Sequence, residues 1–266
     1  MPTLTDQQIY QYRTNGFVNG GPLISESSAD ELAQSIDKVI HRNDLSNSPK
    51  PDILRNLSST EEQPIWQIVN IWKASSLFAK LLEISELKEM AETLTGKHHF
   101  RLWHDQVQYK PKEIGGRLHW HQDLPLWPVM HLGGTQITAW IALDHVGTHN
   151  GCMFMVPGSH RYEDQNSWLQ THEGKWELES HFNFNGIPPQ VMCPVQKGHV
   201  HFHHSLTWHS SGLNRSGLPR RAIAIHLMAP DTLYNSSGNH LMKQFITSQD
   251  GEPINGDGFL PIAAEL

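Results

Sequence analysis

The chain has 266 residues, of which 38% are hydrophobic and 18% are charged, and its formal net charge is −7 at pH 7. This length is enough for a full hydrophobic core in one domain, and the negative charge argues against nucleic acid or an anionic membrane as the main partner. Only 2 cysteines are present, which argues against a disulfide framework and favours a reducing, cytoplasmic location.

Residues 1–97 are expected to be mainly helical. Their start lacks the basic and apolar regions of a signal peptide, and no apolar run in the chain approaches the roughly 18 residues of a membrane span. Residues 5–8 and residues 28–31 fit capping boxes that would each begin a helix. Residues 43–64 are polar and contain prolines, which predicts a loop, and helical spacing of leucines resumes over residues 77–96.

Residues 98–230 change to short apolar runs separated by turn signals, which predicts a sandwich or barrel. Helices followed by such a half fit a mainly β fold with flanking helices, a double-stranded β-helix (jelly roll, cupin-like). We expect residues 160–189 to form a long insertion and residues 231–266 a C-terminal flap, all within one domain covering residues 1–266. The expected strands are 99–109, 117–121, 135–144, 152–156, 190–195, 199–204 and 220–228.

The segment Leu118-His119-Trp120-His121-Gln122-Asp123 holds the first candidate for a functional site. On a strand, His121 and Asp123 would leave the same face, and one imidazole with one carboxylate provides two ligands of a non-haem Fe(II) site. His209 is the candidate for the third ligand. With 19 histidines and 12 aspartates in the chain, roughly one His-x-Asp pair is expected by chance, so this pair alone decides little.

Three further segments follow in a fixed order and give the pair more weight. They are residues 139–160 with the runs Ala-Trp-Ile-Ala-Leu-Asp and Asn-Gly-Cys-Met-Phe-Met-Val-Pro-Gly-Ser-His, residues 209–216 with His-Ser-Ser-Gly-Leu-Asn-Arg-Ser, and residues 220–222 with Arg-Arg-Ala. With these segments in this order, residues 98–230 resemble the phytanoyl-CoA dioxygenase family of Fe(II)/2-oxoglutarate oxygenases.

The resemblance implies a role for several residues. His121, Asp123 and His209 match the iron ligands of the family. Arg220 matches the arginine that holds the distal carboxylate of 2-oxoglutarate, for which a guanidinium fork is well suited, and Ser211 matches a serine that helps to bind it. A surface salt bridge is the alternative for Arg220.

Further matches concern the pocket and the reaction. Gln106 and Trp140 fall where the family lines the co-substrate pocket, and Trp127 falls where some members place a substrate-contacting aromatic; core packing is the alternative for Trp127. Related halogenases have a small residue at the position of Asp123, so the carboxylate favours hydroxylation, desaturation or ring closure over halogenation. Asp144 is the next candidate ligand should Asp123 not bind the metal.

Other charged and imidazole side chains have less specific interpretations. His201 or His203 could approach the metal, and His104 would lie on the same strand face as the pocket residues. Lys110 and Lys112 are expected to be solvated loop residues.

The sequence therefore predicts an Fe(II)/2-oxoglutarate-dependent dioxygenase that uses O2 and oxidises a small-molecule metabolite, with release of succinate and CO2. Two alternatives stay open: a non-catalytic jelly-roll protein that keeps a metal, and a cupin-like metalloenzyme that uses no 2-oxo acid. Nothing in the chain indicates a CoA site, and the tryptophans permit an aromatic or cyclic substrate without requiring one. The substrate, the loops that close the pocket and the oligomeric state are left open.

Overall fold

Two antiparallel sheets form the body of the molecule in the computed structural model, which describes residues 4–42, 47–57, 64–130, 135–171 and 190–263. The larger has seven strands in the order β1-β9-β6-β11-β4-β3-β2, and the smaller has four in the order β5-β10-β7-β8. This mainly β architecture confirms the predicted jelly roll. The strands are β1 (Phe17–Pro22), β2 (Ile53–Asn56), β3 (Trp66–Val69), β4 (Arg101–Lys110), β5 (Leu118–His121), β6 (Gln136–Ala142), β7 (Met153–Met155), β8 (Val191–Cys193), β9 (His199–His204), β10 (His209–Ser211) and β11 (Arg220–Met228).

The first two helices show how local capping sets an element's start. Thr5 and Gln8 form the predicted capping box of the first helix. The second helix begins at Glu26, because the Oγ of Ser25 accepts the backbone N–H of Ser28 at 3.1 Å, so the predicted box at residues 28–31 was wrong. The helices are α1 (Asp6–Asn15), α2 (Glu26–Arg42), α3 (Ser76–Leu81), α4 (Ser85–Thr95) and α5 (Asn166–Thr171), with 3-10 turns η1 (Ile71–Lys73), η2 (Leu124–Leu126), η3 (Ser159–Arg161) and η4 (Leu241–Phe245).

The main hydrophobic core lies between the large sheet and the N-terminal helices. Successive strand residues point to opposite faces, and Ile223, Ile225 and Leu227 of β11 pack into this core with side chains of α2 and α4. The alternate residues of β11 therefore face the small sheet. They are Arg220, Ala222, Ala224 and His226, and the two alanines leave space between the sheets.

Three strands, β2, β3 and β10, are not among the strands predicted from the sequence. β2 lies inside residues 43–64, which had been predicted as a loop, and it pairs with β3. β3 in turn pairs with β4, with Val69 opposite Gln106, so the large sheet extends two strands beyond the jelly-roll core. β10 is only three residues long and is held by β5 on one side and β7 on the other.

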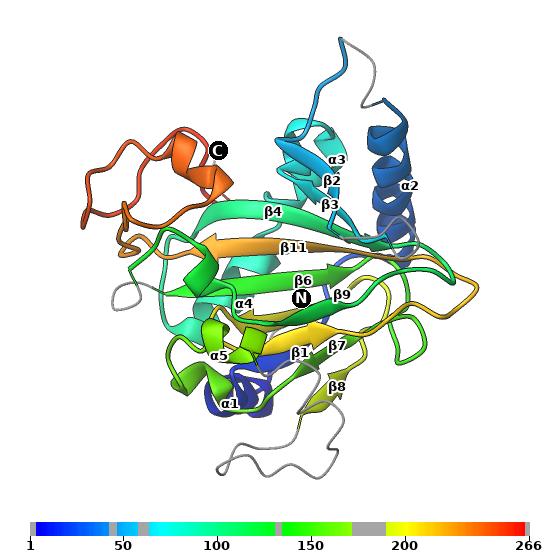
Figure 1. Cartoon of the computed structure of the whole chain (residues 1–266), viewed down its shortest axis with the longest axis horizontal. Coiled ribbons are helices and arrows are strands. Elements are labelled where there is room, and N and C mark those ends of the chain that lie inside the picture. Colours follow the sequence, from blue (N-terminus) through cyan, green and yellow to red (C-terminus); the bar gives the residue numbers. More distant parts are fainter. Residues whose placement is uncertain (1–3, 43–46, 58–63, 131–134, 172–189, 264–266) are drawn as a thin grey trace.

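The C-terminal segment gathers at the end of the sheet where β4 begins and β11 ends, coloured orange to red in Figure 1. The backbone N–H of Leu102 donates to the carbonyl of Leu260 at 2.7 Å. Met242 and Phe259 pack with Trp103 in a small apolar cluster at this end of the sheet. No helix in the described part of the chain is long and apolar enough to cross a membrane.

Candidate metal centre

His121 and His209 face each other across two paired strands. In the antiparallel register of β5 and β10 they lie directly opposite, with ring centroids 4.1 Å apart. The Nδ1 of His121 lies 2.7 Å from the carbonyl of His119, and the Nδ1 of His209 lies 2.9 Å from the carbonyl of Thr207. Because a carbonyl only accepts, each Nδ1 carries the proton and each Nε2 keeps a lone pair for a metal ion.

Asp123 lies close to the two histidines, but its backbone conformation differs from the predicted strand. β5 ends at His121, and Asp123 has helical backbone angles (φ −72°, ψ −51°) at the start of η2. The two residues therefore do not share a strand face, and that part of the prediction was wrong. The backbone N–H groups of Asp123 and Leu124 donate to the carbonyl of Ser205 at 2.9 and 3.0 Å. This anchored turn brings the carboxylate back towards the imidazoles.

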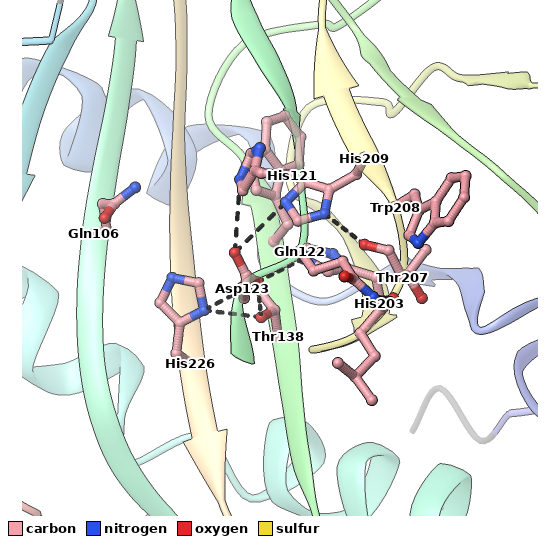
Figure 2. A network of polar contacts seen from close by, with 12 residues as sticks. Gln106, His121, Gln122, Asp123, Thr138, His203, Thr207, Trp208, His209 and His226 are labelled. Atoms are coloured by element: carbon pink, nitrogen blue, oxygen red, sulfur yellow. Dashed lines mark hydrogen bonds and ion pairs between the residues drawn. The ribbon is translucent and has the colours of Figure 1, made fainter. Parts of the chain in front are cut away.

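The side chains of His121, Asp123 and His209, called the triad below, have the spacing of a metal site. The Oδ1 of Asp123 lies 3.7 Å from the Nε2 of His121 and 3.6 Å from the Nε2 of His209 (Figure 2). One ligand atom from each residue lies within 4.8 Å of the others. Two imidazoles and one carboxylate are the donor set of facial non-haem Fe(II) sites, which leave further coordination positions open.

The second oxygen of Asp123 is held by side chains on the large sheet. The Nε2 of His203 lies 3.3 Å from Oδ2, and the hydroxyl of Thr138 donates to it at 3.2 Å. The Nδ1 of His226 lies 2.8 Å from that hydroxyl and 3.8 Å from Oδ2 (Figure 2). Oδ2 is thus engaged on the side of the large sheet, while Oδ1 points to the triad histidines.

Burial and mutual proximity set the charges of the triad. Burial, together with the nearby His209, lowers the pKa of His121 to about 4, and burial lowers the pKa of His209 as well. Burial alone would raise the pKa of Asp123, but His209, His203 and His226 hold it well below its usual value. Neutral imidazoles beside an ionised carboxylate are the forms that bind a metal ion.

A cavity of about 420 Å³ opens beside the triad and contains most of the other predicted site residues. Gln106, Trp140 and Ser211 line it, and so does Trp127. The amide of Gln67 donates to Gln106 at 2.7 Å, which fixes one polar wall of the cavity. The structure therefore places these four predicted residues in one space.

Trp127 is packed in the core and also lines the cavity. Its ring packs 6.0 Å from Trp103 in the apolar cluster under the C-terminal segment. It also contacts the ring of His226 edge-on at 5.2 Å and lines the cavity. His104, which lies opposite His226 on β4, lines the same part of the cavity.

Arg220 lies behind the cavity wall and is fully buried. Its guanidinium stands 4.8 Å from the ring centroid of Trp140, and within the described residues none of its three nitrogens has a hydrogen-bond partner. Burial lowers its pKa to about 10, so it remains a cation at neutral pH. A buried cation without an acceptor is costly, and a carboxylate entering from the cavity would satisfy it.

Arg221, the next residue, points to the other face of the sheet. Its Nε and Nη2 donate to the carboxylate of Asp144 at 3.0 and 2.9 Å, and its Nη1 lies 3.3 Å from Asp37. The carboxylate of Asp144 is therefore occupied by its ion pair with Arg221. The prediction of Asp144 as the next candidate metal ligand after Asp123 was wrong. The alternation also excludes a surface salt bridge for Arg220.

Several residues near the site were missed or misjudged from the sequence. Lys110 is fully buried, so its assignment as a solvated residue was wrong, whereas Lys112 is exposed as expected. Of the two histidines considered near the metal, His203 reaches Asp123, and His201 stacks on Phe17 at 5.9 Å. Strand alternation from Gln106 would have found Lys110, and alternation from Arg220 or Trp140 would have found His226 or Thr138.

The comparison with known families agrees with this geometry. The model of the family "Phytanoyl-CoA dioxygenase (PhyH)" matches residues 12–222. Among curated proteins, the chain is 27% identical over 244 residues to the peroxisomal phytanoyl-CoA dioxygenase of Mus musculus, covering 86% of this chain and 69% of that one.

Solved structures of the same fold span nearly the whole chain. One is the non-haem α-ketoglutarate-dependent carbocyclase SnoK from nogalamycin biosynthesis, at 23% identity and a TM-score of 0.77, covering 98% of this chain and 99% of that one. Another is the epimerase SnoN in complex with Fe3+, α-ketoglutarate and nogalamycin RO, at 23% identity and a TM-score of 0.73, covering 96% of each chain. At this identity the likeness concerns the fold.

Proposed function

The chain belongs to the phytanoyl-CoA dioxygenase family of Fe(II)/2-oxoglutarate-dependent oxygenases, and from this premise we propose that its triad binds the iron of an enzyme that oxidises a small-molecule metabolite. The observation that carries the proposal is the convergence of His121, Asp123 and His209 within 4.8 Å at the edge of a cavity. These donors fit Fe(II) because two neutral imidazoles and one carboxylate leave three positions open.

The same cavity has the features that a 2-oxo acid needs. Arg220 and Ser211 would hold the distal carboxylate, and the unpartnered guanidinium of Arg220 supports this role. Gln106 and Trp140 would line the co-substrate between that end and the metal. When bound together, Fe(II), 2-oxoglutarate and O2 supply an oxidant for a C–H bond, with release of succinate and CO2. The protein's part is to orient both substrates and to exclude water around them.

The primary substrate would enter at the opposite end of the cavity. Trp127, His104 and His240 line that end, where the C-terminal segment packs against the sheet. The Asp123 carboxylate occupies the position that a halide would need, which supports hydroxylation, desaturation or ring closure. Residues 1–97, 98–230 and 231–266 would then serve one oxygenase domain, each supplying part of the walls.

We further infer a reducing compartment and no nucleic-acid partner. Cys152 and Cys193 are both buried free thiols, which supports a cytoplasmic location. The net charge of −7 disfavours binding to polyanions.

The direct test is succinate formation from 2-oxoglutarate by iron-loaded protein under air, with a panel of small cyclic and aromatic metabolites. We expect slow uncoupled turnover without substrate and faster turnover with a true one. Absence of succinate under every condition, from folded protein that binds iron, would contradict the proposal. Calorimetric titration with 2-oxoglutarate separates the alternatives, because a cupin-like enzyme without a 2-oxo acid would show no binding. A metal held only for stability would instead give a sharp fall in melting temperature on chelation.

A further inference from the structure

Lys110 is a buried cation that the reaction described above does not use. Its side chain is fully buried at the end of β4, and no acidic partner contacts it within the described residues. Its Nζ donates to the hydroxyl of Ser211 at 2.7 Å, to the carbonyl of Ser211 at 3.3 Å and to the carbonyl of Gly212. An ammonium group carries three N–H donors, and these three oxygens can engage all of them. The side chain therefore ties β4 of the large sheet to β10 of the small one.

A second buried cation lies directly beside it. Lys110 and Arg220 are opposite one another in the antiparallel register of β4 and β11, and both are fully buried. Burial, and then the neighbouring Arg220, lower the pKa of Lys110 well below its ordinary value. Two adjacent cations are unfavourable in a buried place unless an anion joins them. An anion that enters the cavity would approach Lys110 and Arg220 from the side of Ser211, because Ser211 lines the cavity.

We infer that Lys110 is a positioning residue that orients the Ser211 hydroxyl towards the distal carboxylate of 2-oxoglutarate. An ammonium cannot accept a hydrogen bond, so the oxygen of Ser211 accepts from Lys110 and its own proton is directed elsewhere. Arg220 is likewise only a donor. At this end of the cavity Ser211 and Arg220 then both present donors, which suits a carboxylate and disfavours a 2-oxo acid whose far end is apolar.

This inference rests on the proposed function and concerns selectivity, so its test measures binding. The probes are 2-oxoglutarate and 2-oxopentanoate, which has the same chain with a methyl group at the far end. Calorimetric titration of anaerobic, iron-loaded protein compares the parent chain with Lys110→Met, Ser211→Ala and the double variant. Lys112→Met is the matched control, because Lys112 is exposed two residues further along the chain.

We expect Lys110→Met to lower the preference for 2-oxoglutarate over 2-oxopentanoate by roughly ten- to a hundredfold, the effect of losing a hydrogen bond to a charged group. The affinity for 2-oxopentanoate and for iron should change by less than about threefold, and Lys112→Met should change nothing. Because Lys110 acts through Ser211, adding Ser211→Ala to Lys110→Met should cost little more.

Three results would overturn the inference: equal weakening of both 2-oxo acids in Lys110→Met, fully additive effects in the double variant, or an unchanged preference in Ser211→Ala. The last comparison stands even if Lys110→Met does not fold. Failure of the parent chain to bind 2-oxoglutarate would instead contradict the proposed function itself.

Discussion

Asp123 is the only carboxylate of the triad, and at the scale of single residues it gives the first prediction. Replacing Asp123 with Ala should abolish succinate formation and lower iron affinity, because the metal loses one of three anchors and its only anionic one. Iron content by metal analysis and turnover by succinate assay check this. Thr138→Val is the graded comparison, since it removes only one donor to Oδ2 and should leave iron bound. Unchanged activity in Asp123→Ala would show that the metal lies elsewhere.

Arg220 provides the second prediction at this scale. Arg220→Ala would leave the distal carboxylate without its buried partner, which costs about 3–5 kcal/mol, or roughly two to three decades in 2-oxoglutarate affinity. Arg220→Lys should recover only part, because lysine lacks the planar fork. Titration with 2-oxoglutarate measures both, and iron binding should hardly change in either.

Arg221→Ala is the neighbouring control for co-substrate binding, although it is expected to affect stability. It breaks the pair with Asp144, so it should lower the melting temperature while leaving the 2-oxoglutarate constant nearly unchanged. If Arg221→Ala weakened the co-substrate and Arg220→Ala did not, the roles assigned to Arg220 and Ser211 would both have to be withdrawn.

The sequence was most informative where a residue type and its chemistry coincide. His121, Asp123, His209 and Arg220 could be chosen from ordered motifs, and the structure brings the first three together. Strand alternation could have placed Lys110 on the same face as Gln106, but its position beside Arg220 depends on the register of β4 against β11, which a single sequence does not fix. The contacts of Thr138, His203 and His226 with Asp123 could likewise not be predicted, because they form only after three strands of the large sheet are aligned.

Helices and strands that have capping or turn residues of their own could be predicted from the sequence. Elements that form only because neighbouring strands pair with them could not. α1 has a capping box and a terminal glycine, so both ends could be read from the sequence. β10 consists of His-Ser-Ser, which has little intrinsic strand preference, and it exists because β5 and β7 pair with it on both sides. The turn at η2, which delivers Asp123, depends in the same way on the carbonyl of Ser205.

The C-terminal segment leads to a prediction at the scale of elements. Phe259 is 4% exposed and stacks on Trp103 with ring centroids 5.4 Å apart and an interplanar angle of 3°. Phe259→Ala should remove about 3–5 kcal/mol of packing under the segment. We expect faster limited proteolysis after residue 230 and a lower kcat/KM for the primary substrate, with iron binding retained. Tyr10→Ala, at a 65% exposed aromatic, is the control and should change neither. Equal protease resistance in both variants would mean that the segment is held by other contacts.

For the molecule as a whole, the buried histidines determine how the free energy of unfolding depends on pH. Burial lowers the pKa of His201 to about 3, and those of His204 and His226 to about 4, from an ordinary value of 6.5. A group whose pKa is lower in the folded state adds stability above its unfolded pKa, and this stability is lost as pH falls towards the folded value. The metal-free protein should therefore lose stability steadily between pH 6.5 and 4.

Asp105 acts in the opposite sense. Burial raises its pKa to about 7 despite backbone N–H groups donated by Ile71 and Trp72, so its contribution falls as pH rises from about 4 to about 7. One carboxyl group opposes several imidazoles over the same range, and the histidines should prevail. Asp105→Asn, which cannot titrate, should accordingly steepen the loss of stability on acidification.

His204 allows the histidine contribution to be measured by itself, because it lies outside the triad. Its Nδ1 accepts the backbone N–H of Leu206 at 3.0 Å, and the side-chain oxygen of an asparagine offers the same acceptor without a charge change. In His204→Asn, the dependence of unfolding free energy on pH between 6.5 and 4 should lose up to one proton, about 1.4 kcal/mol per pH unit. Urea unfolding of chelator-treated protein at several pH values gives this slope. An unchanged slope in His204→Asn would show that His204 protonates equally in the folded and unfolded chains.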